Sequence, residues 1–145
     1  MKIVLDTNVL VAGFISPFGP PAAILRAVLT GSMVPCFDER ILAEYRDVLT
    51  RGKFCFDRHR VDDFLRVVET NGLPVLADPL RLVLPDTSDA MFVEVAIAAG
   101  ADCLVTGNLR HFPVERLRTV SPSEETCIMT PREFLDRFLD GQENH

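Results

Sequence analysis

The stretch "IVLDTNVLVAGFI", residues 3–15, places Asp6, Thr7 and Asn8 in the middle of an apolar run. The residues "KIVL" before Asp6 are mostly aliphatic and partly β-branched, which predicts a buried strand that ends at Asp6. One interpretation is structural, because Asp-Thr-Asn after a strand can form turns that hold a sharp bend. Thr7 and Asn8 are expected to support that bend. A turn-forming Asp has no need to follow a buried strand, so Asp6 requires a further explanation.

Outside this stretch, strand-like runs alternate with amphipathic helical patterns along the chain. Helix starts are indicated by Pro20, Asp38 and Thr130, the last with Glu133 in a capping box. The alternation predicts an α/β fold with a parallel sheet and helices on both faces, whose ligand crevice lies outside the carboxyl ends of the strands. Strands are expected at 2–5, 33–37, 73–77, 102–108 and 127–129, and helices at 20–31, 38–52, 57–72, 86–101 and 130–139.

The 145 residues, 48% of them hydrophobic, are typical of one folded domain. We expect that domain to span residues 1–140 and the polar residues 141–145 to form a disordered tail. No apolar run approaches the ~18 residues of a membrane span, and the N-terminal run has no small-residue cleavage pattern. The sequence therefore predicts a cytoplasmic protein with no membrane partner. The four cysteines form no C-x-x-C pair and are expected to be buried free thiols.

The net charge of −6 argues against a protein whose whole surface binds nucleic acid. It does not exclude a nuclease, because carboxylates that hold cations count as negative here. Basic side chains gather in "RGKFCFDRHR", residues 51–60, which includes Arg51 and Lys53. This stretch is either a solvated surface loop or a rim that binds phosphate, since Arg suits bidentate phosphate contacts.

Two more acids lie on the apolar stripes of predicted helices. Asp89 stands three and four residues before Phe92 and Val93, and Glu44 stands three after Ile41 and one before Tyr45. Each has a structural alternative. Asp89 could be the acid of a capping box that begins at Asp86, and Glu44 could sit at the edge of its stripe with its carboxylate in water.

Asp6 ends one strand, and Asn108 ends the strand-like run "CLVTG", so both are expected at the same edge of the sheet. If Asp6, Glu44 and Asp89 converge there, they cannot all stay ionised without a counterion. Oxygen ligands alone suit Mg²⁺ or Mn²⁺ and not zinc. Magnesium keeps several waters, and lowering the pKa of one makes it a nucleophile. A metal site would thus explain the carboxylate at the strand end.

The segments "VLDTNVLVAG", "LAEYRDVLTRGKF", "PDTSDAMFVEVAIAAGADCLVTGNLRHFP" and "IMTPREFL" together resemble the PIN-domain proteins, in particular the branch of toxins of type II toxin–antitoxin pairs. The resemblance implies a three-layer α/β/α sandwich around a parallel sheet of about five strands. It also implies a metal-dependent endoribonuclease that cuts single-stranded RNA, with an antitoxin protein as partner. Pairing into a homodimer is a further expectation.

The resemblance places Asp6, Glu44 and Asp89 on the family's first three catalytic acids. Asn108 falls where many members carry a fourth acid, and the nearby Asp86 could compensate as a metal ligand. The supporting residues are expected to be Thr7, Asn8 and Thr106, and the residues expected to contact RNA are Arg51, Lys53, Arg110 and His111.

The main alternative is a protein of the same fold that binds RNA or a protein partner and is catalytically weak or inactive. Asn108 favours this alternative, whereas the retained Asp6, Glu44 and Asp89 oppose it. A P-loop NTPase is excluded because no Gly-x-x-x-x-Gly-Lys occurs.

Overall fold

The computed structural model describes residues 1–78, 87–112 and 126–139. These residues form a five-stranded, entirely parallel sheet in the order β3-β2-β1-β4-β5. The strands are β1 (Lys2–Leu5), β2 (Val34–Phe37), β3 (Leu73–Pro74), β4 (Cys103–Val105) and β5 (Cys127–Met129). The predicted α/β/α fold with a parallel sheet is confirmed. β3 is shorter than the strand expected at 73–77.

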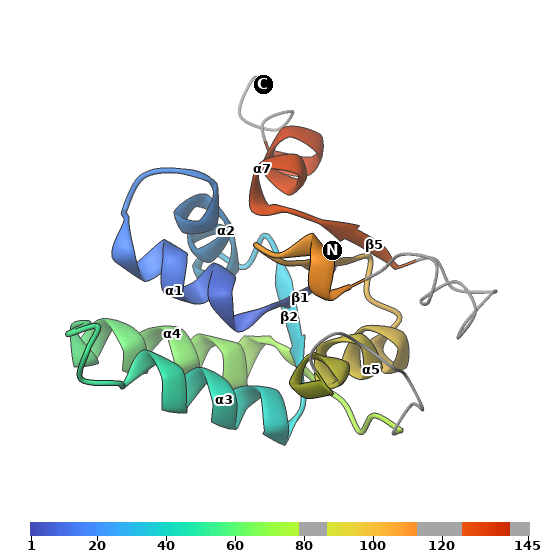
Figure 1. The fold of residues 1–145 in the computed structure, drawn as a ribbon, viewed down its shortest axis with the longest axis horizontal. Coiled ribbons are helices and arrows are strands. Elements are labelled where there is room, and N and C mark those ends of the chain that lie inside the picture. Colours follow the sequence, from blue (N-terminus) through green and yellow to red (C-terminus); the bar gives the residue numbers. More distant parts are fainter. Residues whose placement is uncertain (79–86, 113–125, 140–145) are drawn as a thin grey trace.

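The helices lie on both sides of this sheet. Figure 1 shows α5 and α7 on opposite sides of the strands, and α3 and α4 side by side as an antiparallel pair. The longer helices are α1 (Thr7–Ile15), α2 (Pro20–Leu29), α3 (Glu39–Leu49), α4 (Arg58–Asn71) and α5 (Ala90–Ala99). The shorter ones are η1 (Thr87–Asp89), η2 (Leu109–His111), α7 (Pro131–Phe134) and η3 (Leu135–Leu139).

The helix starts follow the expected caps. The Asp38 carboxylate accepts a hydrogen bond from the Ile41 backbone N–H at 3.0 Å, and Thr130 Oγ1 accepts one from Glu133 at 3.2 Å. At its other end, α5 closes on Gly100 in the left-handed conformation, with φ of +59°, which glycine adopts without a Cβ penalty.

The main departure from expectation is α1, because residues 7–15 are helical where only a bend was expected. "TNVLVAGFI" is apolar on nearly every side, so its spacing carries little helical signal. α1 packs closely on α2: a Cβ added to Gly13 would stand 2.5 Å from Leu25 Cδ1. This close approach sets the direction in which α1 leaves the end of β1.

The tail expected at 141–145 lies outside the described residues, and so does Asp86. Within them, no single helix is long and apolar enough to cross a membrane; α1 and α2 reach that length and composition only as a pair, bent by 101°. All four cysteines are free. Cys36 and Cys103 are buried as expected, but Cys55 is exposed because it lies in the turn between α3 and α4.

Candidate active site

The candidate site lies where the strand order of the sheet reverses. The chain builds β1, β2 and β3 in one direction and then returns to place β4 on the other side of β1. Such a reversal opens a crevice outside the carboxyl ends of the two neighbouring strands. Asp6 directly follows β1 and Thr106 directly follows β4. The Asp6 backbone N–H donates to the Val105 carbonyl at 2.9 Å, which joins the two strand ends.

The Asp6 side chain is buried at this edge, with 5% of the residue exposed. Its Oδ2 accepts hydrogen bonds from the Thr106 hydroxyl at 2.8 Å and from the Asn8 side-chain amide at 3.2 Å. Burial raises the pKa of Asp6 above its ordinary value, and the nearby Glu44 carboxylate raises it further, whereas the Thr106 hydrogen bond lowers it. No Lys, Arg or His within the described ranges forms an ion pair with Asp6. The site therefore holds an acid without a cation to neutralise it.

Glu44 reaches the same edge from α3. It is half-buried beside the buried stripe of this helix, and its Oε2 accepts a hydrogen bond from the hydroxyl of the buried Thr7. The next residue, Tyr45, is buried and donates its hydroxyl to the Leu5 carbonyl at 2.5 Å. Because Leu5 is the last residue of β1, this bond fixes α3, and with it Glu44, next to Asp6. Burial raises the pKa of Tyr45, and Asp6 and Glu44 add to the effect.

Asp89 is connected to this edge through His111 and Asn108. Asp89 is 7% exposed, and its Oδ2 lies 2.9 Å from His111 Nδ1. The other ring nitrogen, Nε2, lies 3.0 Å from the Asn108 side-chain amide. The two ring nitrogens of His111 thus lie against two different polar side chains. The Asn108 backbone N–H donates to Thr106 Oγ1 at 3.0 Å, so hydrogen bonds link Asp6 through Thr106 to Asn108, and His111 lies between Asn108 and Asp89.

The helix boundary bears on the capping interpretation of Asp89. The α-helix begins at Ala90, after the short η1 turn, so Asp89 precedes α5 and does not lie in its first turn. Its side chain makes no capping hydrogen bond to α5. The proposed cap partner, Asp86, lies outside the described residues. The Asp89 carboxylate lies 2.9 Å from His111 Nδ1 instead.

The residues at this edge of the sheet lie within the part of the chain that matches a known protein family. A family model of the PIN domain matches residues 2–110, which include β1, α3, β4 and every acid described above. The chain belongs to the PIN-domain family. PIN domains are in general nucleases and typically use divalent metals such as Mg²⁺, so membership indicates a nuclease-type function. No curated protein and no solved structure matches the chain.

The donor set of this PIN domain fits a hard divalent cation in its chemistry. Asp6 and Glu44 offer carboxylate oxygens, the ligands that Mg²⁺ and Mn²⁺ prefer, and the Glu44 carboxylate raises the pKa of Asp6 in the absence of a cation. Across residues 1–78, 87–112 and 126–139, however, no three acidic, His or Cys side chains stand close enough together to hold a metal ion. Of the three acids that were expected to meet, Asp6 and Glu44 lie close together, whereas the Asp89 side chain lies against His111.

A third buried acid, Glu94 on α5, was not predicted from the sequence. Its side chain is 4% exposed, and its Oε1 lies 2.7 Å from Arg40 Nη1; the same guanidinium contacts Asp38 Oδ2 at 2.7 Å. One signal was present, because Glu94 is the only charged residue between Ala90 and Ala101. A lone charge in so apolar a helix indicates a buried ion pair, but the sequence does not give the partner.

Of the remaining predicted residues, Asn8 and Arg110 lie near the strand ends, whereas Arg51 and Lys53 lie in the turn between α3 and α4. Asn8 Oδ1 accepts a hydrogen bond from the Gly107 backbone at 3.0 Å, which ties the start of α1 to the end of β4. Arg110 is exposed next to His111. Arg51 pairs with Asp47 at 3.0 Å, and the Lys53 ammonium lies 5.0 Å from the Phe54 ring centre. RNA contact by these basic side chains stays a prediction.

Proposed function

We propose that this PIN domain is a metal-dependent endoribonuclease that cleaves single-stranded RNA in the cytoplasm, with Mg²⁺ or Mn²⁺ as cofactor. The observation that carries the proposal is the pair Asp6 and Glu44. Two adjacent carboxylates at the switch point of the sheet have no cationic partner in the described part of the chain. Such a pair binds protons or a cation, and membership of a nuclease family favours the cation.

The residues around the acids have defined roles in this proposal. When bound, the cation supplies charge neutralisation for the phosphate and an acidified water as nucleophile. Thr106 and Asn8 fix the direction of Asp6 Oδ2, and Thr7 fixes Glu44 Oε2, so both oxygens are oriented before any ligand arrives. Asn108 and His111 hold Asp89 at the border of the pair. The third acid would enter the metal site by exchanging its contact with His111.

Cleavage of a single-stranded RNA oligomer with and without Mn²⁺ tests the proposal. The intact protein is expected to cut the oligomer only with the metal, and Asp6→Asn to lose at least about 100-fold in rate. The matched control is Asp63→Asn. The Asp63 side chain is 71% exposed and forms a long surface ion pair with Arg66 at 3.8 Å, so this variant should cut the oligomer normally. Equal background cleavage in the intact and Asp6→Asn proteins would contradict the proposal.

The likeness to toxins supports a second level of the proposal, namely that the protein is the toxin of a type II toxin–antitoxin pair. Expression of the intact chain is then expected to arrest growth, and a small antitoxin protein from a neighbouring reading frame should relieve the arrest and co-purify. We also propose a homodimer, since Phe18 and Leu76 expose 82% and 98% of their surface. Sedimentation of the purified chain tests this.

A catalytically weak or inactive module that binds RNA or a protein partner is the second candidate. Two observations favour it: Asn108 stands where the resemblance expects a fourth acid, and His111 engages Asp89. Binding of the same oligomer without any Mn²⁺-dependent cleavage would select this candidate over the nuclease.

A further inference from the structure

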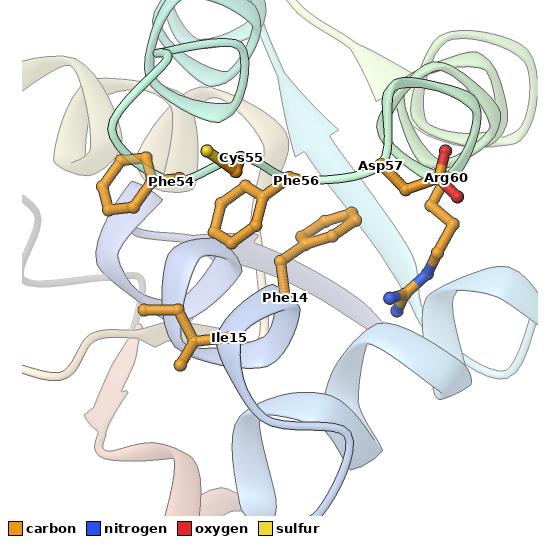
Figure 2. Close-up of a pocket in the computed structure, with 7 residues that line it drawn as sticks. All are labelled: Phe14, Ile15, Phe54, Cys55, Phe56, Asp57 and Arg60. Atoms are coloured by element: carbon orange, nitrogen blue, oxygen red, sulfur yellow. The ribbon is translucent and has the colours of Figure 1, made fainter.

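A row of aromatic rings lies at the turn between α3 and α4, away from the acids. Phe54 and Phe56 stack with ring centres 5.0 Å apart and an angle of 2° between their planes. Phe14, near the end of α1, packs against Phe56 at 5.5 Å. Figure 2 shows Phe56 between the other two rings. We call Phe54, Phe56 and Phe14 the aromatic row.

The aromatic row has a cation at each end. The Lys53 ammonium lies 5.0 Å from the Phe54 ring centre, and the Arg60 guanidinium lies 5.5 Å from that of Phe14. The surrounding stretch, residues 51–60, carries four Lys or Arg and one Asp, a net charge of +3 in a chain whose total is −6. Although Arg51 is paired with Asp47, this local excess of positive charge favours a polyanion more than the chain as a whole does.

The turn that presents the row is held by its own hydrogen bonds. Cys55 adopts a φ of +51°, which is uncommon for a residue other than glycine. Its backbone N–H and its thiol both donate to the Gly52 carbonyl, at 3.3 and 3.1 Å. The row is also tied to the core, because Phe14 meets the buried Phe64 edge-on at 5.8 Å. The rings are thus fixed in place before a ligand binds.

A pocket of about 330 Å³ opens beside the row, lined by Phe14, Ile15, Phe54, Phe56 and Arg60 among others (Figure 2). At ~30 Å³ per water it holds roughly ten waters, near the lower limit of small-ligand pockets. A protein helix, about 10–12 Å across with its side chains, is too wide for such a space. A flat ring between aromatic and cationic side chains is the occupant that both the size and the charge favour.

Resting on the proposed ribonuclease function, we propose that the aromatic row is a subsite for an unpaired base of single-stranded RNA. Stacking on Phe54, the outer ring of the row, holds the base, and Lys53 and Arg60 contact the flanking phosphates. Phe14 stands eight residues after Asp6, about 12 Å along α1, a distance of roughly three or four stacked nucleotides at 3.4 Å each. The subsite would thus hold the substrate a few nucleotides from the cut.

The test separates binding from cleavage. Anisotropy of a fluorescent oligouridine and of an abasic oligomer of equal length is measured in EDTA, with Asp6→Asn as the parent protein. Phe54→Ala is expected to weaken binding of oligouridine by about 5- to 100-fold, and Phe54→Trp to restore it. The abasic oligomer should bind the parent and Phe54→Ala equally. Leu29→Ala removes an exposed leucine at the end of α2 that does not line the pocket and should leave both affinities unchanged.

Two results would overturn the subsite. One is unchanged binding of oligouridine by Phe54→Ala, and the other is an equal loss of affinity for the abasic oligomer. If Phe54→Ala leaves RNA binding intact but abolishes self-association in sedimentation, the row is a protein interface and the proposal is wrong. If binding depends on Phe54 but the intact protein never cleaves RNA, the subsite stands and the nuclease function is rejected. If the intact protein cleaves RNA with Mn²⁺ but Phe54→Ala binds oligouridine normally, the nuclease function stands and the subsite is rejected.

Discussion

Two buried carboxylates, Asp6 and Glu94, meet opposite electrostatic surroundings in one small domain. Glu94 is 4% exposed in its side chain and has the Arg40 guanidinium at 2.7 Å. Asp6 is 5% exposed and has hydroxyl and amide donors on one oxygen, with a second acid, Glu44, close enough to raise its pKa. Among the described residues, the fold gives one buried acid a cationic partner and gives the other none.

If Asp6 holds a cation as proposed, this difference separates a structural acid from a functional one. An acid that only stabilises the fold gains from a cationic partner, as Glu94 does, because burial without one is costly. An acid that must bind a metal is better left without a cation in the protein, even though the fold loses stability. Neutralising substitutions of the two acids should therefore change the stability of the metal-free protein in opposite directions.

The largest expected change in stability is in Arg40→Ala. This variant leaves Glu94 buried without its guanidinium, and we expect a loss of about 2–3 kcal/mol in the free energy of unfolding. The estimate lies below the range for fully buried pairs because the Arg40 side chain is 47% exposed. Urea unfolding at pH 7 measures it. Arg66→Ala, which breaks an exposed pair at 3.8 Å, should change stability by less than about 0.5 kcal/mol. Equal losses in both variants would remove the distinction.

Tyr45→Phe tests how the acid pair is held in place. The variant removes the hydroxyl that donates to the Leu5 carbonyl in the core, at an expected cost of about 1–2 kcal/mol. Because the same bond fixes α3 next to β1, Mn²⁺-dependent cleavage should fall more than stability explains. A variant that unfolds earlier but cleaves at the normal rate while folded would show that this bond does not position Glu44.

Asp6→Asn and Glu94→Gln should have opposite effects on stability in metal-free solution. The folded state raises the pKa of Asp6, so it binds more protons than the unfolded chain, and stability falls as pH rises through the unfolded pKa of about 3.9 toward the folded value. Asp6→Asn is therefore expected to raise Tm at pH 7, with the gain lost below about pH 4. Glu94→Gln should lower Tm at pH 7, since it removes an ion pair. Thermal scans at several pH values check both signs, and a drop in Tm for both variants would contradict the contrast.

The smallest expected change follows Asn108→Asp. The added carboxylate increases the negative charge at the edge that already holds Asp6, so the metal-free protein should lose a few tenths of a kcal/mol and bind Mn²⁺ more tightly. Calorimetric titration and unfolding measured on the same sample compare the two effects. A gain in stability without any gain in Mn²⁺ affinity would argue that Asn108 has no connection with the acids.

Much of the fold could be predicted because its signals are local. Asp38 and Thr130 cap their helices through hydrogen bonds three residues apart, and Asp6 follows a strand whose apolar residues are contiguous. The edge that brings Asp6 near Glu44 follows from parallel topology alone. α1 was not predicted, because a helix that is apolar on most sides has no spacing to detect.

The parts that could not be predicted depend on contacts between distant residues. Arg40 reaches Glu94 across 54 positions, and the sequence gives no sign which cation that acid meets. His111 was expected to contact RNA, whereas both of its ring nitrogens lie against Asn108 and Asp89. The aromatic row joins Phe14 of α1 to a turn forty residues later, and only packing in three dimensions brings them together.

Calorimetric titration of Mn²⁺ into the intact, metal-free protein tests most directly whether the acids at the end of β1 are held for a cation. We predict saturable binding that is lost in Asp6→Asn and in Glu44→Gln and kept in Glu94→Gln. No binding by the intact protein, or binding that survives both Asp6→Asn and Glu44→Gln, would contradict it.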